Sequence, residues 1–253
     1  MSRELQGIVL VLVGIVTLRI SWGTAYLNYV KEEMRPWLLL SGVVLVVLGV
    51  LAIVDVLRGR GDEADPHDVD DDPGDHVHAH ATEGDHTHHH GGPRTAWLLL
   101  LPVATLFLVA PPALGSYAAA RDITNSVPTT TGLPPLPAGD PVEMYLSDYV
   151  TRAVWEEGVS LEGRTVELTG FVLPTDDGWQ LTRLQIACCA ADAFASKVQP
   201  IDLPDGAQDL PADTWVTVTG EWVPGEGAPS VYSVPLLRVK SIEQVPPPEN
   251  PYD

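Results

Sequence analysis

The sequence has little positive charge. Its 253 residues include 34 Asp and Glu but only 14 Lys and Arg, which gives a formal net charge of −20 at pH 7. A protein that binds nucleic acid neutralises phosphates with clustered Lys and Arg, and no segment of this sequence carries such a cluster. Nucleic acid is therefore excluded as a partner.

Cysteine and histidine are missing from most of the chain. The two cysteines, Cys188 and Cys189, are adjacent. Neighbouring Cα atoms lie about 3.8 Å apart, whereas an ordinary disulfide joins Cα atoms about 5.5 Å apart, so no disulfide framework is expected. No histidine follows residue 90, which excludes a Cys–His pair or a Ser–His–Asp triad within the C-terminal part. We therefore expect no enzymatic activity.

Long apolar runs, by contrast, are plentiful near the N-terminus. A membrane core about 30 Å thick requires roughly 20 apolar residues in a helix. Residues 5–30 and 37–57 reach this length, and we interpret them as a pair of transmembrane helices within residues 1–60. Arg19 lies inside the first helix. An intramembrane charge is costly and often functional, although a long arginine side chain can also extend to the membrane surface.

A third apolar stretch is shorter. Residues 96–110 would cover about 22 Å as a helix before Pro111 and Pro112 interrupt it. The stretch spans a membrane only if a kinked helix continues to Ala120. We assign residues 95–120 as a third transmembrane helix, so that two to three such helices are expected.

Three spans would place the N-terminus and residues 58–94 on one side of the membrane, and residues 31–36 and the C-terminal part on the other. Four Lys and Arg flank the helices on the first side, against three on the second. Because positively charged loops stay in the cytoplasm, this difference predicts a multi-pass membrane protein with the N-terminus and residues 58–94 in the cytoplasm and the C-terminal part outside it.

Residues 61–94 form a loop rich in histidine and aspartate, here called the histidine loop. Residues 62–92 contain ten acidic residues and no Lys or Arg. Such a composition cannot bury a core, so the loop is expected to be disordered. Imidazoles bind zinc and other divalent transition metals, and we expect metal binding of low specificity; the alternative is a solvated acidic linker. The candidate ligands are His67, His76, His78, His80, His86, His88, His89 and His90.

The C-terminal part has the pattern of a linker followed by a soluble domain. Prolines in residues 121–141 indicate an extended linker. Residues 142–253 begin with helical spacing over 144–157 and continue with strand-like runs. Two runs share a Thr-Gly pair, at Gly170 and Gly220, and glycine within a strand often marks a bulge or bend. We therefore predict a mainly β domain with a short leading helix, a small open barrel similar to the oligonucleotide/oligosaccharide-binding (OB) fold. The runs are 165–173, 179–189, 198–203, 214–223 and 231–245.

The second of these runs ends in Cys188-Cys189-Ala-Ala-Asp192. Side chains of a strand alternate between its two faces. If the strand continues through Cys189, one thiol packs in the core, as free cysteine commonly does, and the other lies on the opposite face. If the strand ends at residue 187, both sulfurs and the Asp192 carboxylate converge at a turn, which would suit a soft metal ion or thiol redox chemistry.

Several segments together have a recognisable pattern. They are the helix pair joined through Tyr29-Val30 and Arg35-Pro36, the strands Gly170-Phe171-Val172 and Trp215–Gly220, the motif Arg183-x-x-x-x-Cys188-Cys189-Ala-Ala-Asp192, and the Pro251-Tyr252 end. In these segments the chain resembles the YcgQ-like permease subunit family of bacteria, whose members are small proteins of the bacterial cell membrane that accompany a multi-spanning permease. The resemblance therefore implies a polytopic membrane partner. It brings no catalytic residues and no substrate, and it does not extend to the histidine loop.

Three functions fit these features, each in a chain embedded in the lipid bilayer. The first is an accessory subunit of a permease or transport complex that handles a divalent metal such as zinc. The second is a stand-alone membrane protein that binds or senses metal through the histidine loop and Cys188/Cys189. The third is a membrane-tethered redox protein that uses the two thiols.

Overall fold

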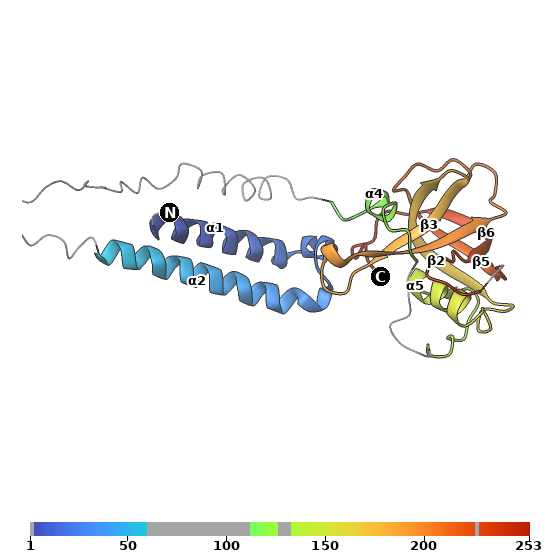
Figure 1. Ribbon diagram of the computed structural model, residues 1–253, viewed down its shortest axis with the longest axis horizontal. Coiled ribbons are helices and arrows are strands. Elements are labelled where there is room, and N and C mark those ends of the chain that lie inside the picture. The colour runs from blue at the N-terminus through green and yellow to red at the C-terminus, as the bar shows by residue number, and fades with distance from the viewer. Residues whose placement is uncertain (1–2, 60–111, 126–132, 226–227) are drawn as a thin grey trace, which may run out of the picture. The chain divides into compact units, whose positions relative to one another are not determined.

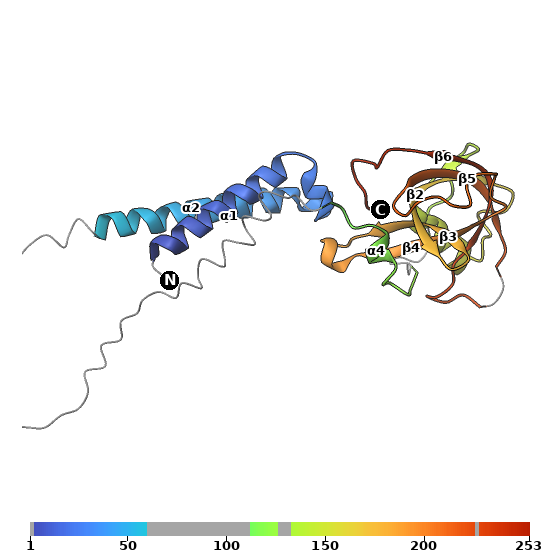
Figure 2. The same cartoon turned by 90° about the horizontal axis from the view of Figure 1, so that it is seen from above.

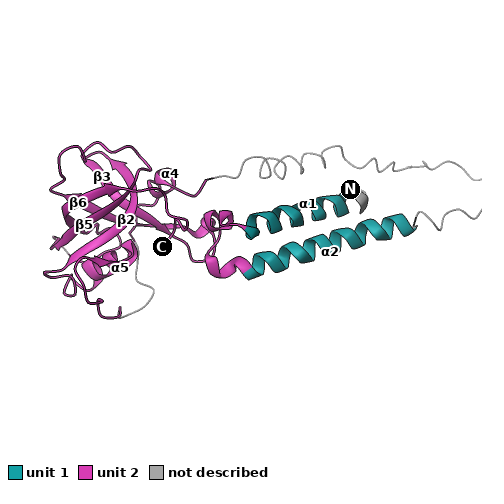
Figure 3. Cartoon of the chain, turned by 180° about the vertical axis from the view of Figure 1, so that it is seen from behind, with its two compact units in different colours: residues 1–22, 36–110 teal, residues 23–35, 111–253 magenta. Residues whose placement is uncertain are grey.

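The computed structural model describes residues 3–59, 112–125, 133–225 and 228–253. They belong to two compact units, which Figure 3 colours separately. The helical unit contains the two N-terminal helices. The β unit contains the C-terminal part and also residues 23–35, the interhelical loop. The eight histidines, and the third apolar stretch up to Pro111, lie outside the described residues.

Two long helices make up the described part of the helical unit (Figure 1). Helix α1 spans Arg3–Trp22 and helix α2 spans Arg35–Gly59. Both are long and apolar enough to cross a membrane. Arg19 lies in the last turn of α1. A long side chain at the end of a helix can place its charge at the membrane surface.

Glycines bring α1 and α2 close together. A Cβ atom added to Gly14 would lie 2.9 Å from the carbonyl oxygen of Gly42, and one added to Gly49 would lie 2.8 Å from that of Gly7. Small residues let membrane helices approach closely. In lipid, the hydrophobic effect does not drive helix association, so the van der Waals contacts of this close approach hold the helices together. Elsewhere both helices expose aliphatic side chains that suit lipid: Ile8, Leu12, Ile15, Leu40, Val43, Val44, Val47, Leu48, Val50 and Leu51.

The C-terminal part of the β unit is a mixed sheet of six strands with short helical segments. Its elements are α4 (Ser116–Ala119), β1 (Val142–Glu143), α5 (Leu146–Val150), the π-helical turn η4 (Thr151–Trp155), β2 (Thr165–Thr175), β3 (Gly178–Gln185), η5 (Ala190–Asp192), β4 (Phe194–Ile201), β5 (Trp215–Val223) and β6 (Leu236–Gln244). The strand order is β1-β2-β3-β4-β6-β5, and β5 pairs in addition with β2 (Figure 2). The pairs β1–β2 and β4–β6 are parallel and the others antiparallel.

The long strand β2 changes partners along its length. Up to Phe171 it pairs with β5, and from Phe171 onward it pairs with β3. Gly170 lies at this change, where an added Cβ would be 2.7 Å from the carbonyl oxygen of Thr182. Gly220 lies at an irregularity in the β5–β6 register. The two Thr-Gly pairs thus mark a close backbone approach and a bulge, as their sequence pattern predicts.

The main core lies between the leading helix and the sheet. Leu146, Tyr149 and Val150 of α5 are buried against strand residues such as Leu168 and Leu181. The Tyr149 hydroxyl donates to the carbonyl of Leu236 over 2.6 Å. Burial raises the pKa of Tyr149, so this phenol stays protonated and the bond is kept. The helical segment is therefore held by burial of one face, as its apolar spacing predicts.

A smaller core cluster joins α4 to the sheet. Ala119 is fully buried with Phe171, Leu184, Ile186 and Tyr252. Residues 112–115 are not helical, α4 has only four residues, and Ala119 is buried in this core, so the kinked helix expected to continue to Ala120 does not form over these residues. Residues 112–120 belong instead to the β unit, and the earlier part of the third apolar stretch is outside the described part of the chain.

Three strand boundaries differ from the sequence pattern by four or five residues. Strand β3 ends at Gln185, before the cysteines, because Gln185 opposite Phe194 is the last pair of its ladder with β4. Strand β4 begins at Phe194, the first residue that pairs with β3. The apolar pattern does not indicate this start, because the buried residues Ser196 and Lys197 are polar. Strand β6 begins at Leu236, after Pro235.

Candidate metal centre

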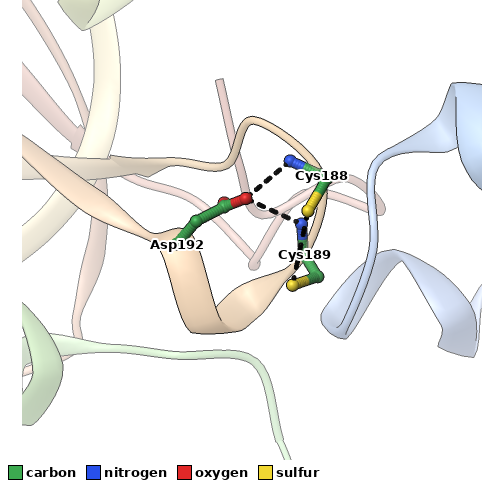
Figure 4. A group of neighbouring side chains, drawn as sticks. All are labelled: Cys188, Cys189 and Asp192. Carbon is green, nitrogen blue, oxygen red and sulfur yellow. Dashed lines mark hydrogen bonds between the residues drawn. The ribbon is translucent and has the colours of Figure 1, made fainter.

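The connection between β3 and β4 carries the cysteine motif, and one carboxylate organises it (Figure 4). Asp192 accepts the amide N–H groups of Ala187 and Cys188, each over 2.9 Å, and that of Cys189 over 3.4 Å. These bonds close η5 with an N-terminal capping arrangement in which Cys189 is the cap residue. The motif therefore forms a turn rather than the end of a strand, which is the second of the two conformations that the sequence allowed.

The turn brings the two thiols together. The Sγ atoms of Cys188 and Cys189 are 3.6 Å apart, and neither is in a disulfide. Cys188 is exposed and Cys189 is partly buried. Both sulfurs and a carboxylate oxygen of Asp192 lie within 4.8 Å of one another. Two soft ligands and one hard ligand thus converge at the surface of the β unit.

The distance between the sulfurs matches one edge of a tetrahedral metal site. With zinc–sulfur bonds of about 2.3 Å, two thiolates of a tetrahedral zinc ion lie about 3.8 Å apart. A disulfide would instead require about 2.05 Å between the sulfurs. The observed 3.6 Å is close to the first value, so both thiols can bind one ion with little movement. Cys188, Cys189 and Asp192 would be the ligands.

The electrostatics of the turn favour a cation over a free thiolate. The nearby Cys188 thiol, together with three backbone amides, lowers the pKa of Asp192. In turn, the neighbouring Asp192 carboxylate and Cys189 thiol raise the pKa of Cys188 to about 12. At neutral pH the site therefore holds a carboxylate beside a protonated Cys188 thiol. A metal ion can displace such a thiol proton, whereas a nucleophilic cysteine needs a lowered pKa.

The interhelical loop lies directly against the cysteine turn. The amide of Lys31 donates to the carbonyl of Cys188 over 3.2 Å, and the amide of Ala190 donates to the carbonyl of Tyr29 over 2.7 Å. Between these bonds Val30 and Cys189 form an isolated antiparallel bridge. Both partners belong to the β unit. The sequence places Tyr29–Lys31 in the connection between the two helices but does not indicate that this connection pairs with the cysteine turn, because pairing across such a distance leaves no local signal.

The end of the chain holds the same loop at a second point. The Tyr252 hydroxyl donates to the carbonyl of Asn28 over 2.9 Å and accepts the amide of Leu114 over 3.1 Å. Burial raises the pKa of Tyr252, which keeps the phenol protonated as a donor. The next residue, Asp253, forms an ion pair of 2.7 Å with Arg183 of β3. The C-terminal residues thus fasten three separate segments together.

The sequence-predicted residues fall into three groups. Cys188, Cys189 and Asp192 are brought together. Arg19 lies in α1. The candidate ligands of the histidine loop, from His67 to His90, lie outside the described residues.

Comparison with known proteins locates one family match. Residues 144–252 match the family model described as DUF1980 C-terminal domain, so the match includes most of the sheet and the whole cysteine motif. Searches of curated proteins and of solved structures gave no match.

Proposed function

We propose that the chain is a membrane-anchored accessory subunit of a transport complex, and that its β unit binds a divalent ion of the zinc class through Cys188, Cys189 and Asp192. The observation that carries the proposal is the convergence of two sulfurs and a carboxylate within 4.8 Å, with the sulfurs 3.6 Å apart. Zinc is favoured because thiolate and carboxylate ligands, at tetrahedral spacing, are its usual protein environment.

An OB-like barrel would give this site a rigid support. The pairing runs from β2 through β3, β4, β6 and β5 and returns to β2, which supports a closed or nearly closed barrel. In such a barrel the β3–β4 connection projects from one end. A metal site on a turn between two paired strands is held more precisely than one on a free loop.

The position of the interhelical loop supports the multi-pass arrangement. The loop is continuous with α1 and α2, and it belongs to the same compact unit as the sheet. If both helices cross the membrane, the sheet lies on the loop's side. The chain would leave α2 on the opposite side, so the proposal includes a third crossing before Pro112, within the shorter apolar stretch. The histidine loop and the β unit would then lie on opposite sides of a bacterial cell membrane, and the count of flanking Lys and Arg assigns the histidine loop to the cytoplasm.

A polytopic permease is the proposed partner. Three helices provide no alternating-access pathway by themselves, since secondary transporters build their sites from many helices in repeated halves. The exposed aliphatic faces of α1 and α2 can meet either lipid or the helices of such a partner. The histidine loop would gather divalent metal on the cytoplasmic side.

Metal binding can be tested on the full chain in mild detergent. Cobalt(II) serves as a zinc analogue, because its sulfur-to-metal absorption reports thiolate ligation alone, and zinc then displaces it. We expect one thiolate-bound cobalt per chain, lost in the variant Cys188→Ser/Cys189→Ser. Deletion of residues 66–90 is the matched control and should keep the thiolate band. A wild-type chain without that band removes the ion site from the proposal.

The partner can be tested separately. Purification in mild detergent from the native membrane, with chemical cross-linking, should recover a multi-spanning protein together with this chain. A chain that remains monomeric under cross-linking would favour the stand-alone metal-binding or metal-sensing function.

The thiol redox function makes the opposite prediction for reactivity. The raised pKa of Cys188 counts against it, because redox cysteines are activated as thiolates. Alkylation by iodoacetamide at neutral pH should be slow for Cys188 in the metal-free chain. Rapid alkylation there would favour the redox function over the metal site.

A further inference from the structure

We infer that the interhelical loop is part of the framework of the ion site, so that docking of Tyr29–Lys31 and binding of an ion at Cys188 and Cys189 stabilise each other. The inference rests on the proposed function, since it takes the two thiols as an ion site. It adds the regulation of that site by a segment far away in the sequence.

The contact surrounds the more buried of the two cysteines. The Lys31 amide binds the carbonyl of Cys188, and the Tyr29 carbonyl binds the amide of Ala190. These two groups belong to the residues immediately before and after Cys189, which lies opposite Val30. The docked loop therefore fixes the backbone from which the Cys189 thiol projects.

The backbone between the cysteines must be held for the thiols to converge. In an extended strand, neighbouring side chains point to opposite faces. Here the two sulfurs are 3.6 Å apart. Asp192 binds the amides of Cys188 and Cys189, while the loop binds the carbonyl of Cys188 and the amide of Ala190. The two sets of bonds use different backbone groups, so Asp192 does not replace the loop when the loop leaves.

Linkage makes the effect reciprocal. If docking raises the affinity for the ion by some factor, ion binding strengthens docking by the same factor. The loop continues into α1 after Trp22 and into α2 at Arg35. An ion at the cysteine turn therefore stabilises the conformation of the segment that joins the two apolar helices. In this way, occupancy of the ion site in the β unit would change the conformation that the helix connection presents to a membrane partner.

Lys31 allows a matched pair of variants. Its backbone has φ −62° and ψ 147°, which proline adopts without strain, and Val30 before it is extended, as a residue before proline prefers. Lys31→Pro therefore removes the amide that binds Cys188 without forcing a new backbone conformation. Lys31→Ala keeps the amide and removes the same charged side chain, so it is the control.

The experiment measures cobalt affinity of the full chain in detergent by the thiolate absorption band. We expect Lys31→Pro to bind cobalt about three- to tenfold more weakly than Lys31→Ala, which lacks the same charged side chain, because only Lys31→Pro loses the backbone hydrogen bond. As a second measurement on the wild-type chain, zinc should slow hydrogen exchange at the amides of Lys31 and Ala190. In Cys188→Ser/Cys189→Ser, zinc should leave both amides unchanged.

The outcomes separate this inference from the proposed function. A normal thiolate band in wild type, with equal affinities for Lys31→Pro and Lys31→Ala and no zinc effect on exchange, would overturn the coupling and leave the ion site intact. A wild-type chain with no thiolate band would overturn both. If Lys31→Pro unfolds the β unit, the exchange measurement on the wild-type chain still decides the question.

Discussion

Val30 and Cys189 lie opposite each other in an antiparallel β-bridge, although one belongs to the loop between the N-terminal helices and the other to the turn that carries both thiols. The bridge makes the interhelical loop part of the same compact unit as the sheet. It also places the proposed ligands beside the segment through which the chain passes between α1 and α2.

Asp192 should contribute to the turn and to the ion site in separable ways. Asp192→Ala removes the acceptor of three amides and should lower the free energy of unfolding by about 1–2 kcal/mol. Asp192→Asn keeps an acceptor but loses the negative charge, so it should cost less stability while still weakening cobalt binding. Thermal unfolding and cobalt titration of the two variants check this. Equal stability losses in both would mean that charge, not hydrogen bonding, organises the turn.

The Tyr252 hydroxyl should stabilise the docked loop. Tyr252→Phe keeps the buried ring and removes the bonds to Asn28 and Leu114, which should lower the free energy of unfolding by about 1–2 kcal/mol. Tyr232→Phe is the matched control, because Tyr232 is 66% exposed. Chemical denaturation of the full chain in detergent measures both changes. If the two variants behave alike, the hydroxyl does not hold the loop.

The topology can be read from the accessibility of single cysteines in a Cys188→Ser/Cys189→Ser chain. We expect Glu33→Cys in the interhelical loop and Asp205→Cys in the β unit to react with an impermeant maleimide from the same side of the membrane. Asp75→Cys in the histidine loop should react from the opposite side. Labelling of all three positions from one side would contradict three spans.

The buried carboxyl of Asp253 should make stability depend on pH. Burial raises the pKa of Asp253 to about 6, and Arg183 offsets only part of this effect. The folded chain therefore holds this proton more tightly than the unfolded chain, whose pKa is near 3.8. The contribution of this group to stability is greatest below about pH 4 and is lost as the pH rises to about 6.

Asp253→Asn isolates that contribution, because it leaves every other titrating group in place. As the pH rises from 4 to 6, the melting temperature of the wild-type chain should fall relative to that of Asp253→Asn. A difference that is constant over this range would mean that the ion pair with Arg183 balances the cost of burial.

Local patterns in the sequence predicted much of the fold. The apolar lengths of α1 and α2 are properties of short continuous segments, and so is the strand pattern around Gly170 and Gly220. The sequence does not decide where β3 ends, because residues up to Cys189 continue to alternate like a strand. The Asp192 carboxylate sets the end of β3, because it binds the amides of Ala187 and Cys188, which a longer strand would have paired with β4.

The long-range contacts were beyond sequence reasoning for a physical reason. Nothing in Tyr29-Val30-Lys31 differs from an ordinary short connection between two helices, and its partner at Cys188–Ala190 uses only backbone groups. Hydrogen bonds between backbone groups do not depend on side-chain identity, so a single sequence does not indicate which segments pair. Likewise, the ion pair between Arg183 and Asp253 depends on the C-terminal residues lying along β3.

The docking of the interhelical loop also has a consequence for how the protein is made. Tyr29 and Val30 leave the ribosome long before the cysteine turn, and Tyr252, which binds Asn28, is synthesised later still. The loop therefore cannot form these contacts until the segments that it pairs with have been synthesised. Its final conformation is a late event in maturation, because contacts between distant segments form only after the intervening chain is in place.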